Sequence, residues 1–284
     1  MKKVLIIGAT GFIGSNITPK LKSSGFEVTL FKGDVRNISD WENNIKGQEI
    51  ILHLAGVKTE TDLDYQINTD GIENLFKAIE ITGRLPSKIV FFSSQAVYLG
   101  CKAPFKETME PKPTTVYGKS KFKAEQIAQQ KSAKLQIQLV ILRLSTVLGE
   151  GIRRNTTMSG PLNNWVKLGF KGKKIKVFQD GNQTRDYLGI KDVVSASLIS
   201  INKIKSGIFN VGGGQKYRLI DLAELVKTTT SNKAVIEIVG GGATSSDPRE
   251  LISDISRLEK FGWKPKQSLK SAVLGLINLY HTQK

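Results

Sequence analysis

The sequence predicts an α/β fold in which a doubly wound parallel sheet is followed by a smaller, mixed α/β lobe. In the first half of the 284 residues, short apolar runs alternate with segments of helical periodicity. This alternation is typical of a parallel sheet that is covered by helices on both faces. A segment with three glycines follows the first apolar run directly, and after about residue 150 glycine, lysine and loop residues dominate as far as Asp180.

The elements can be assigned in order along the chain, because short runs rich in Val, Ile, Leu and Phe are typical of buried strands. We expect such strands at Val4–Ile7, Glu27–Phe31, Ile50–Leu54, Lys88–Phe92 and Leu139–Leu144. Helical patterns lie between them, for example at Gly71–Ile81 and Lys119–Gln130. The later segments Asp192–Ile201, Gly207–Val211, Leu219–Thr228 and Val235–Val239 indicate a smaller mixed lobe. No Pro/Ser-rich linker separates the lobes, so we expect them to pack directly together.

The composition of the chain argues against several classes of function. The net charge is +17, but the lysines are spread along the whole chain, and no recognition helix or aromatic-basic interleaving is evident. We therefore expect a solvated basic surface and no nucleic-acid partner. One cysteine and two histidines exclude an internal disulfide and argue against a zinc site or a Ser-His-Asp mechanism. No apolar run approaches the roughly 20 residues of a membrane span, and the first run is too short for a signal peptide. We expect a cytoplasmic protein without a metal.

The glycine segment is the first candidate site. Gly8, Gly11 and Gly14 follow the first strand in the spacing G-x-x-G-x-x-G and open a helix. Glycines at a strand–helix junction allow the backbone to approach a pyrophosphate, and the helix N-terminus then supplies N–H donors and a partial positive charge. The alternative is a purely structural turn. We expect a dinucleotide to contact Gly8, Thr10, Gly11, Phe12, Ile13 and Gly14.

The end of the second strand bears on the choice of cofactor. A carboxylate there hydrogen-bonds the ribose 2′-OH of NAD, whereas a cation accepts the 2′-phosphate of NADP. The strand runs into Lys32-Gly33-Asp34-Val35-Arg36. Lys32 and Arg36 favour NADP, while Asp34 suits the adenine or the ribose, so both cofactors stay open. Lys32 is equally consistent with a solvated strand end.

Tyr117 and Lys121 are spaced i and i+4, which places them on one face of a helix. A free phenol has a pKa near 10, and a nearby ammonium favours the phenolate. Such a tyrosine can take a hydroxyl proton while hydride leaves the same carbon for a nicotinamide. Ser93 and Ser94 end the buried strand upstream, at the sheet edge that faces the cofactor crevice. A hydroxyl there can hold the reacting oxygen; its alternative role is a local backbone bond.

Together these residues resemble the extended short-chain dehydrogenase/reductase family, in particular its nucleotide-sugar epimerases, dehydratases and reductases. The resemblance covers nearly the whole chain and implies a Rossmann-type sheet with NAD or NADP. It implies a catalytic triad of Ser94, Tyr117 and Lys121. Asp34 resembles the family's adenine aspartate, with Val35 beside it. Leu54, Ala55 and Gly56 resemble its motif beside the cofactor.

The C-terminal half extends the resemblance to the substrate class. Arg185, in Gly181–Tyr187, resembles the arginine that holds the substrate diphosphate, and a guanidinium suits phosphate oxygens. Segments 209–212 and 247–254 also resemble family segments. The resemblance implies a dinucleotide-binding domain at residues 1–150, to which residues 181–215 contribute, and a mainly substrate-binding lobe at 151–284. It also implies a homodimer.

Four departures from the family's pattern matter. The region between the second strand and Asp34 is missing, which removes much of the usual adenosine pocket. Thr146 stands where many relatives carry Asn. Thr244 replaces a second phosphate-binding arginine, for which Arg249, or Arg153 and Arg154, compensates. Gln95 and Ala96 replace the acidic pair of the 4,6-dehydratases, so we do not expect that activity. The expected substrate-binding residues are Ser94, Gln95, Thr146, Arg185 and Arg249.

We therefore expect an epimerase that acts on a nucleotide-diphosphate sugar through a transient keto-sugar and reversible hydride transfer. The main alternative is an NADPH-dependent keto-sugar reductase that uses the same residues once in one direction. A third alternative, a cofactor-sensing protein without catalysis, would normally have lost Tyr117 or Lys121. The sequence leaves open which sugar and which nucleotide are bound.

Overall fold

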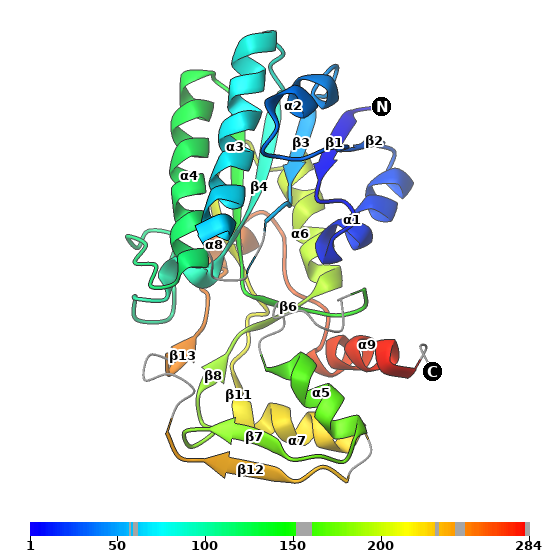
Figure 1. The fold of residues 1–284 in the computed structure, drawn as a ribbon, viewed down its shortest axis with the longest axis vertical. Helices are drawn as coiled ribbons and strands as arrows, with labels where there is room; N and C mark the ends of the chain where they lie inside the picture. Colours follow the sequence, from blue (N-terminus) through cyan, green and yellow to red (C-terminus); the bar gives the residue numbers. More distant parts are fainter. Residues whose placement is uncertain (57, 59–61, 152–160, 231–232, 242–247, 282–284) are drawn as a thin grey trace.

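A six-stranded sheet forms the upper part of the molecule (Figure 1). The computed structural model describes residues 1–56, 58, 62–151, 161–230, 233–241 and 248–281. All neighbouring strands are parallel, in the order β10-β5-β4-β3-β1-β2. The strands are β1 (Lys3–Ile7), β2 (Glu27–Leu30), β3 (Ile50–His53), β4 (Lys88–Ser94), β5 (Gln138–Leu144) and β10 (Gly207–Val211). The strand order reverses between β1 and β3, which is where ligands bind in sheets of this kind.

Helices cover both faces of the sheet, as Figure 1 shows. One face carries α1 (Phe12–Ser23) and α6 (Ile190–Asn202), and the other carries α2 (Ile38–Asn44), α3 (Asp62–Thr82) and α4 (Val116–Lys134). Strand residues alternate between the two cores: Val140 packs on the α1/α6 side, and Leu139 on the α3/α4 side. The sheet therefore has two buried faces, as its continuous apolar strands require. The predicted α/β, doubly wound Rossmann-type fold is confirmed.

The turn after β2 is short. β2 is the last strand at its edge of the sheet, and only residues 31–33 separate it from Asp34. Gly33 has φ +126°, and a Cβ at that position would lie 2.4 Å from the Asp40 carboxylate. Because only glycine accommodates both constraints, the chain can turn at once from β2 to α2.

The lower lobe in Figure 1 is built from short strands and helices. β7 (Ile175–Phe178) pairs with β12 (Ile236–Val239). β8 (Thr184–Arg185) lies between β11 (Tyr217–Arg218) and β13 (Glu250–Leu251). The helices are α5 (Leu162–Phe170), α7 (Leu219–Thr229) and α9 (Leu269–His281).

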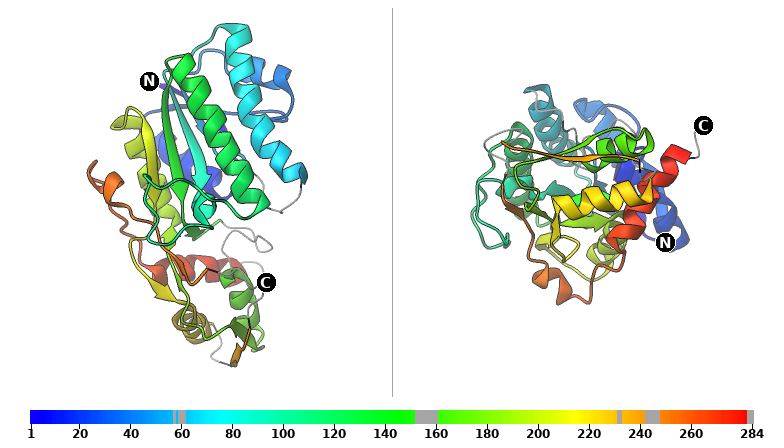
Figure 2. Two further views of the ribbon diagram at one scale, coloured as in Figure 1. Left: turned by 90° about the vertical axis from the view of Figure 1, so that its left-hand side faces the viewer. Right: turned by 90° about the horizontal axis from the view of Figure 1, so that it is seen from below.

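The two parts of the molecule share elements. β6 (Thr146–Leu148) pairs with β9 (Tyr187–Gly189), and the chain then re-enters the upper part as α6 and β10. The short helix α8 (Ser256–Glu259) lies against β10 (Figure 2). The carboxylate of Asp192, on α6, accepts the backbone N–H groups of Lys266 and Gln267, at 2.8 and 2.9 Å. Through the described ranges, no helix combines the length and apolar character needed to cross a bilayer.

Candidate functional site

The glycine loop lies at the point where the strand order reverses. Gly8 has φ +84°, and a Cβ there would lie 2.9 Å from the backbone nitrogen of Ala55. A Cβ at Gly14 would lie 2.2 Å from the Gly8 carbonyl oxygen. These two glycines therefore allow a left-handed turn and let the first turn of α1 lie directly on the loop. The N-terminus of α1 carries no acidic residue and no side-chain cap, so its N–H groups and partial positive charge suit an anion.

A cavity of about 360 Å³ opens beside this loop. Its lining combines the glycine loop, the turn after β2 with Asp34 and Val35, and Ala55. Its lining residues are Ile7, Gly8, Ala9, Thr10, Leu30, Phe31, Gly33, Asp34, Val35 and Ala55. A lining of apolar side chains, one carboxylate and a glycine loop could hold the adenosine half of a dinucleotide.

The charged residues after β2 have different partners. Arg36 donates to the Asp34 carboxylate from Nε (3.0 Å) and Nη2 (2.5 Å), and these hydrogen bonds lower the pKa of Asp34 to about 2. The Asp34 N–H donates to Asp40. The backbone of Lys32 is held at both its N–H and its C=O by the side chain of Asn44, while Lys32 itself is exposed. Of the two cations, Lys32 is therefore the one whose position does not depend on Asp34.

Ser94, Tyr117 and Lys121 lie on β4 and α4, which pack against each other. Ser94 is the last residue of β4, and Tyr117 lies in the first turn of α4, which Thr115 caps by accepting the Gly118 N–H at 3.0 Å. One turn later, the buried Lys121 donates from Nζ to the Phe92 carbonyl oxygen at 2.9 Å. This bond ties the helix with Tyr117 to the strand that ends in Ser94.

Burial determines the acid–base properties of Lys121. It lowers the pKa of the ammonium to about 8, against a smaller opposing effect of the Glu125 carboxylate. A Cβ at Gly56 would lie 2.9 Å from Lys121 Nζ and 3.0 Å from Asn68 Oδ1. Gly56 therefore leaves the space in which the ammonium lies, beside the motif that follows β3.

Of two further residues near the tyrosine, Lys58 was not identified from the sequence, whereas Asn68 begins the segment Asn68-Thr69-Asp70-Gly71, which resembles the family's Asn-x-x-Gly helix start. Lys58 Nζ lies 5.7 Å from the centre of the Tyr117 ring. Asn68 donates to Ser120 Oγ at 2.9 Å, and Ser120 donates in turn to the Tyr117 carbonyl at 2.8 Å. For Lys58 the one available signal was proximity in sequence, because it comes two residues after Gly56.

The predicted substrate-binding residues differ from one another in burial and in hydrogen-bond partners. Arg185 is buried on β8 and donates from Nη1 to the carbonyls of Thr184 (2.9 Å) and Pro248 (3.0 Å). Thr146 is half-buried, and its strand β6 pairs with β9 just beyond Arg185. Gln95 is buried, and its Oε1 accepts from Ser253 Oγ at 3.4 Å. Arg153, Arg154 and Thr244 lie outside the described residues.

The guanidinium of Arg249 forms an ion pair with Asp180. Its Nη1 and Nη2 donate to Oδ1 and Oδ2 of Asp180 at 2.7 and 2.8 Å, and both side chains are largely exposed. The pKa of Asp180 is accordingly far below its usual range. Arg249 would have to leave Asp180 before it could bind a phosphate with both of these nitrogens.

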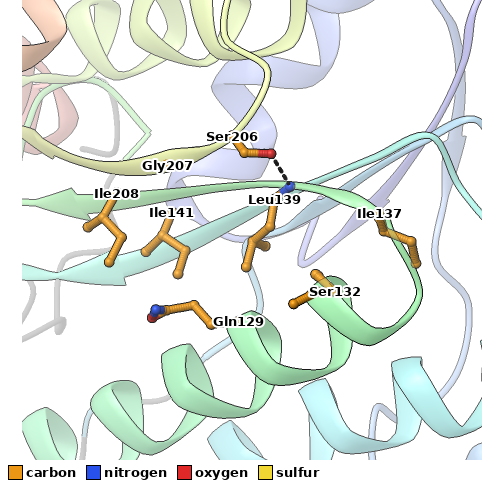
Figure 3. Close-up of a pocket in the computed structure, with 9 residues that line it drawn as sticks. Gln129, Ser132, Ile137, Leu139, Ile141, Ser206, Gly207 and Ile208 are labelled. Atoms are coloured by element: carbon orange, nitrogen blue, oxygen red, sulfur yellow. Dashed lines mark hydrogen bonds between the residues drawn. The ribbon is translucent and has the colours of Figure 1, made fainter.

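A second hollow, of about 260 Å³, lies between the C-terminal half of α4 and the beginning of β5 and β10 (Figure 3). Its wall is apolar, with Leu139, Ile141 and Ile208 side by side, and Ser206 Oγ accepts the Leu139 N–H at 3.1 Å. Because parallel strands begin here, this hollow is at the opposite end of the sheet from Ser94. It contains none of the predicted site residues. Among the described residues, no group of three or more His, Cys, Asp or Glu side chains could hold a metal ion.

Comparisons with known proteins agree with the resemblance seen in the sequence. Residues 4–212 match the model of the "NAD dependent epimerase/dehydratase family". The chain is 26% identical to a dTDP-L-rhamnose 4-epimerase of Burkholderia thailandensis (96% of this chain, 93% of the relative) and 24% identical to a UDP-glucose 4-epimerase of Lactobacillus helveticus (98% and 97%).

Among solved structures, the UDP-glucose 4-epimerase of Thermotoga maritima with UDP-glucose superposes with a TM-score of 0.89 at 24% identity, over 99% of this chain and 100% of that one. This likeness concerns the fold. The family model covers most of the chain, including the glycine loop, Ser94, Tyr117, Lys121 and Arg185. The chain therefore belongs to the NAD-dependent epimerase/dehydratase family.

Proposed function

We propose that this protein is an NAD(P)-dependent epimerase that acts on a nucleotide-diphosphate sugar. The observation that carries the proposal is the meeting of β4 and α4, which brings the strand ending in Ser94 to the helix with Tyr117 and the buried Lys121. Family membership supports redox chemistry with NAD, and relatives named as nucleotide-sugar 4-epimerases favour epimerisation.

The cofactor would be held by two sets of residues. The first is the glycine loop from Gly8 to Gly14, which would bind the pyrophosphate at the start of α1. The second comprises Asp34, Val35 and Ala55, which line the adjacent cavity, and Leu54 and Gly56 next to Ala55 in the chain. Tyr117 and Lys121 would lie at the nicotinamide ribose. A bound nicotinamide ring supplies a reversible hydride acceptor.

The remaining chemistry belongs to side chains of this protein. Tyr117 would take the proton from a sugar hydroxyl and return it after the keto-sugar has turned its other face to the nicotinamide. Ser94 Oγ accepts the Ala96 N–H at 3.2 Å, so its own hydrogen remains available for the reacting oxygen. The Lys121 ammonium would stabilise the negative charge on the phenolic oxygen of Tyr117.

The substrate would lie across the lower lobe. Arg185 is the proposed ligand of the diphosphate, because it is a buried guanidinium at the start of the chain's return to the sheet. Gln95 and Thr146 would line the sugar, and Arg249 would contribute only after release from Asp180. In this proposal residues 1–150 and 181–215 mainly hold the dinucleotide, and residues 151–284 mainly hold the nucleotide sugar.

We also propose that the protein works in the cytoplasm as a homodimer, without a nucleic-acid partner. The family resemblance supports the dimer, and the spread of lysines supports a solvated surface. Light scattering coupled to size exclusion would test the dimer: a mass near twice 31.3 kDa is expected, and a mass near 31.3 kDa would contradict it.

A reductase remains the second candidate, because Lys32 is an exposed cation at the strand end where a 2′-phosphate would lie. The two activities differ in their use of the cofactor. We would identify the dinucleotide that co-purifies and incubate the protein with UDP- and dTDP-hexoses, following sugar configuration by NMR and absorbance at 340 nm.

An epimerase should interconvert two sugars without net consumption of the reduced cofactor. A reductase should consume one equivalent of NADPH for each keto-sugar reduced, which would favour the second candidate. No change in any sugar and no oxidation of NADPH across the substrate panel would contradict both.

A further inference from the structure

A buried ion pair lies behind the proposed catalytic residues. Arg143, on β5, donates from Nε to both carboxylate oxygens of Glu125, at 3.0 and 3.2 Å, and from Nη2 to Oε2 at 2.5 Å. The side chains of Arg143 and Glu125 are 2% and 0% exposed. Removing two charges from water costs free energy that their attraction only partly offsets. A pair of this kind is therefore poorly explained by stability alone.

The third nitrogen of Arg143 reaches a different element. Nη1 donates to the hydroxyl of Tyr98 at 2.5 Å, and that hydroxyl donates to Asn210 Oδ1 at 3.2 Å. Asn210 is anchored in turn, because its Nδ2 donates to the carbonyl oxygens of Phe105 and Asp254. The Tyr98 hydroxyl is thus held on both sides and can occupy only one position.

Tyr98 ends the short helix η1 (Gln95–Tyr98), which begins directly after Ser94. Ser94 caps this helix through the bond from the Ala96 N–H to its Oγ. Fixing Tyr98 therefore fixes the turn that orients Ser94. The register supports this, because Arg143 is paired with Ser93 across the strands β4 and β5.

Glu125 makes the corresponding connection to α4. Tyr117, Lys121 and Glu125 are spaced by four residues and share one side of that helix. The first turn of α4 lies directly on η1, since a Cβ at Gly118 would be 2.6 Å from the Ala96 carbonyl oxygen. One guanidinium therefore ties together the two elements that carry the serine and the tyrosine.

We propose that Arg143, acting through Tyr98 and Glu125, is the positioning residue that sets the separation between Ser94 Oγ and the Tyr117 hydroxyl. None of the three contacts substrate in this proposal, which rests on the function proposed above. Misplacing a catalytic group by about 1 Å can cost about 100-fold in rate. The arrangement should therefore affect kcat far more than the binding of either ligand.

Tyr98→Phe is the most direct test, because it removes one hydroxyl and leaves the ion pair and the ring packed on Phe105 in place. We expect kcat to fall at least about tenfold while the KM for the nucleotide sugar and the Kd for the dinucleotide change less than about threefold. Lys88→Met is the matched control. Lys88 is buried at the other end of β4, where its ammonium donates to the carbonyls of Ser200, Ile201 and Ile204.

The control should lower Tm at least as much as Tyr98→Phe and leave kcat within about twofold of wild type. An unchanged kcat in Tyr98→Phe, or an equal loss of kcat in both variants, would overturn the proposal. Crystal structures of wild type and Tyr98→Phe give a second measurement that needs no turnover. We expect the Ser94 Oγ–Tyr117 Oη distance to change by about 1 Å or more; an unchanged distance would overturn the positioning role.

These outcomes separate the two proposals. If wild type converts no nucleotide sugar but the distance changes in Tyr98→Phe, the proposed function fails and the positioning role stands. If wild type is active and neither kcat nor the distance changes, only the positioning role fails.

Discussion

Asp180 and Arg249 form a two-point ion pair on the surface of the lower lobe, with N–O distances of 2.7 and 2.8 Å. Arg185, 64 residues earlier in the chain than Arg249, is buried instead, and its Nη1 donates to two backbone carbonyls. The two arginines predicted to bind the substrate are therefore not equivalent. A buried guanidinium contributes more to a charge-assisted bond with phosphate than an exposed one that is held by a carboxylate.

Arg185→Ala should raise the KM for the nucleotide sugar by roughly ten- to 100-fold, since a charge-assisted bond to phosphate contributes about 1.5–3 kcal/mol. Affinity for the dinucleotide should stay unchanged, because its pyrophosphate is assigned to the glycine loop. Arg249→Ala is the matched control and should change KM less than about threefold. Steady-state kinetics and cofactor titration would show both effects. Loss of dinucleotide binding with an unaltered KM for the nucleotide sugar would show that the assignment of Arg185 to the substrate site is wrong.

Tyr117→Phe should abolish turnover while cofactor binding stays nearly intact, because only the phenolic oxygen is lost. General acid–base groups typically contribute about 10²–10⁴-fold to a rate. The comparison is between kcat, measured with the nucleotide sugar, and the dissociation constant of the dinucleotide, measured by calorimetry. Turnover within a few-fold of wild type would contradict the assignment of Tyr117.

Lys32→Asp tests the preference for NADP. The backbone of residue 32 is bound to Asn44 at both its N–H and its C=O, so the substitution should change the charge and leave the turn intact. If Lys32 meets a 2′-phosphate, affinity for NADP should fall at least about tenfold, equivalent to about 1.4 kcal/mol, while affinity for NAD changes little. Lys46→Asp is the control, an exposed lysine outside the cavity lining. Equal effects on the affinities for the two cofactors would indicate that Lys32 is a solvated surface residue that does not contact the cofactor.

Gly14→Ala tests the glycine loop. The added methyl group would lie 2.2 Å from the Gly8 carbonyl oxygen, so the loop must open before α1 can form. Dinucleotide affinity should fall at least about tenfold, and Tm should fall as well. At Gly240, by contrast, no described atom lies within 4 Å of an added Cβ, and Gly240→Ala should leave both quantities unchanged. Unchanged dinucleotide affinity in Gly14→Ala would contradict the placement of the pyrophosphate.

Much of the upper sheet could be predicted because its strands are buried on both faces, and Val4–Ile7 and Leu139–Leu142 are therefore continuously apolar. The start of α3 could not be predicted from hydrophobic periodicity. The helix begins at Asp62, well before Gly71, and its first part includes the buried Asn68, which is held by Ser120. A polar residue that is buried by a distant partner leaves no hydrophobic periodicity to detect.

The candidate site, too, could be predicted only in part from the sequence. Motif residues such as Tyr117 and Lys121 are close in sequence, so their spacing alone indicates a shared helix face. The ion pair of Asp180 with Arg249 joins residues that are 69 positions apart, and the pair of Glu125 with Arg143 is made across a helix and a strand. Two-residue strands such as β8 and β13 carry no pattern of their own and exist only through pairing. Such relationships depend on tertiary structure.

Asp186 leads to a prediction about stability and pH. It is fully buried, and burial raises the pKa of its carboxyl group to about 7, against the opposing hydrogen bond from the Gly213 N–H. A carboxyl group with a raised pKa in the folded state stabilises the fold below its unfolded pKa, near 4, and this contribution is lost as pH rises towards 7. A shift of about three units corresponds to about 4 kcal/mol, so the free energy of unfolding should decline between pH 4 and 7.

Asp186→Asn keeps the oxygen that accepts from Gly213 and removes the ionisation. The variant should therefore gain stability relative to wild type as pH rises from 5 to 8, measured by urea unfolding at both values. Asp192→Asn is the control: both Asp192 oxygens accept backbone N–H groups, so losing one acceptor should destabilise the fold at either pH. A constant difference between Asp186→Asn and wild type at pH 5 and pH 8 would show that the Asp186 carboxyl group is already ionised throughout this range. In that case the hydrogen bond from Gly213, rather than burial, would determine its charge.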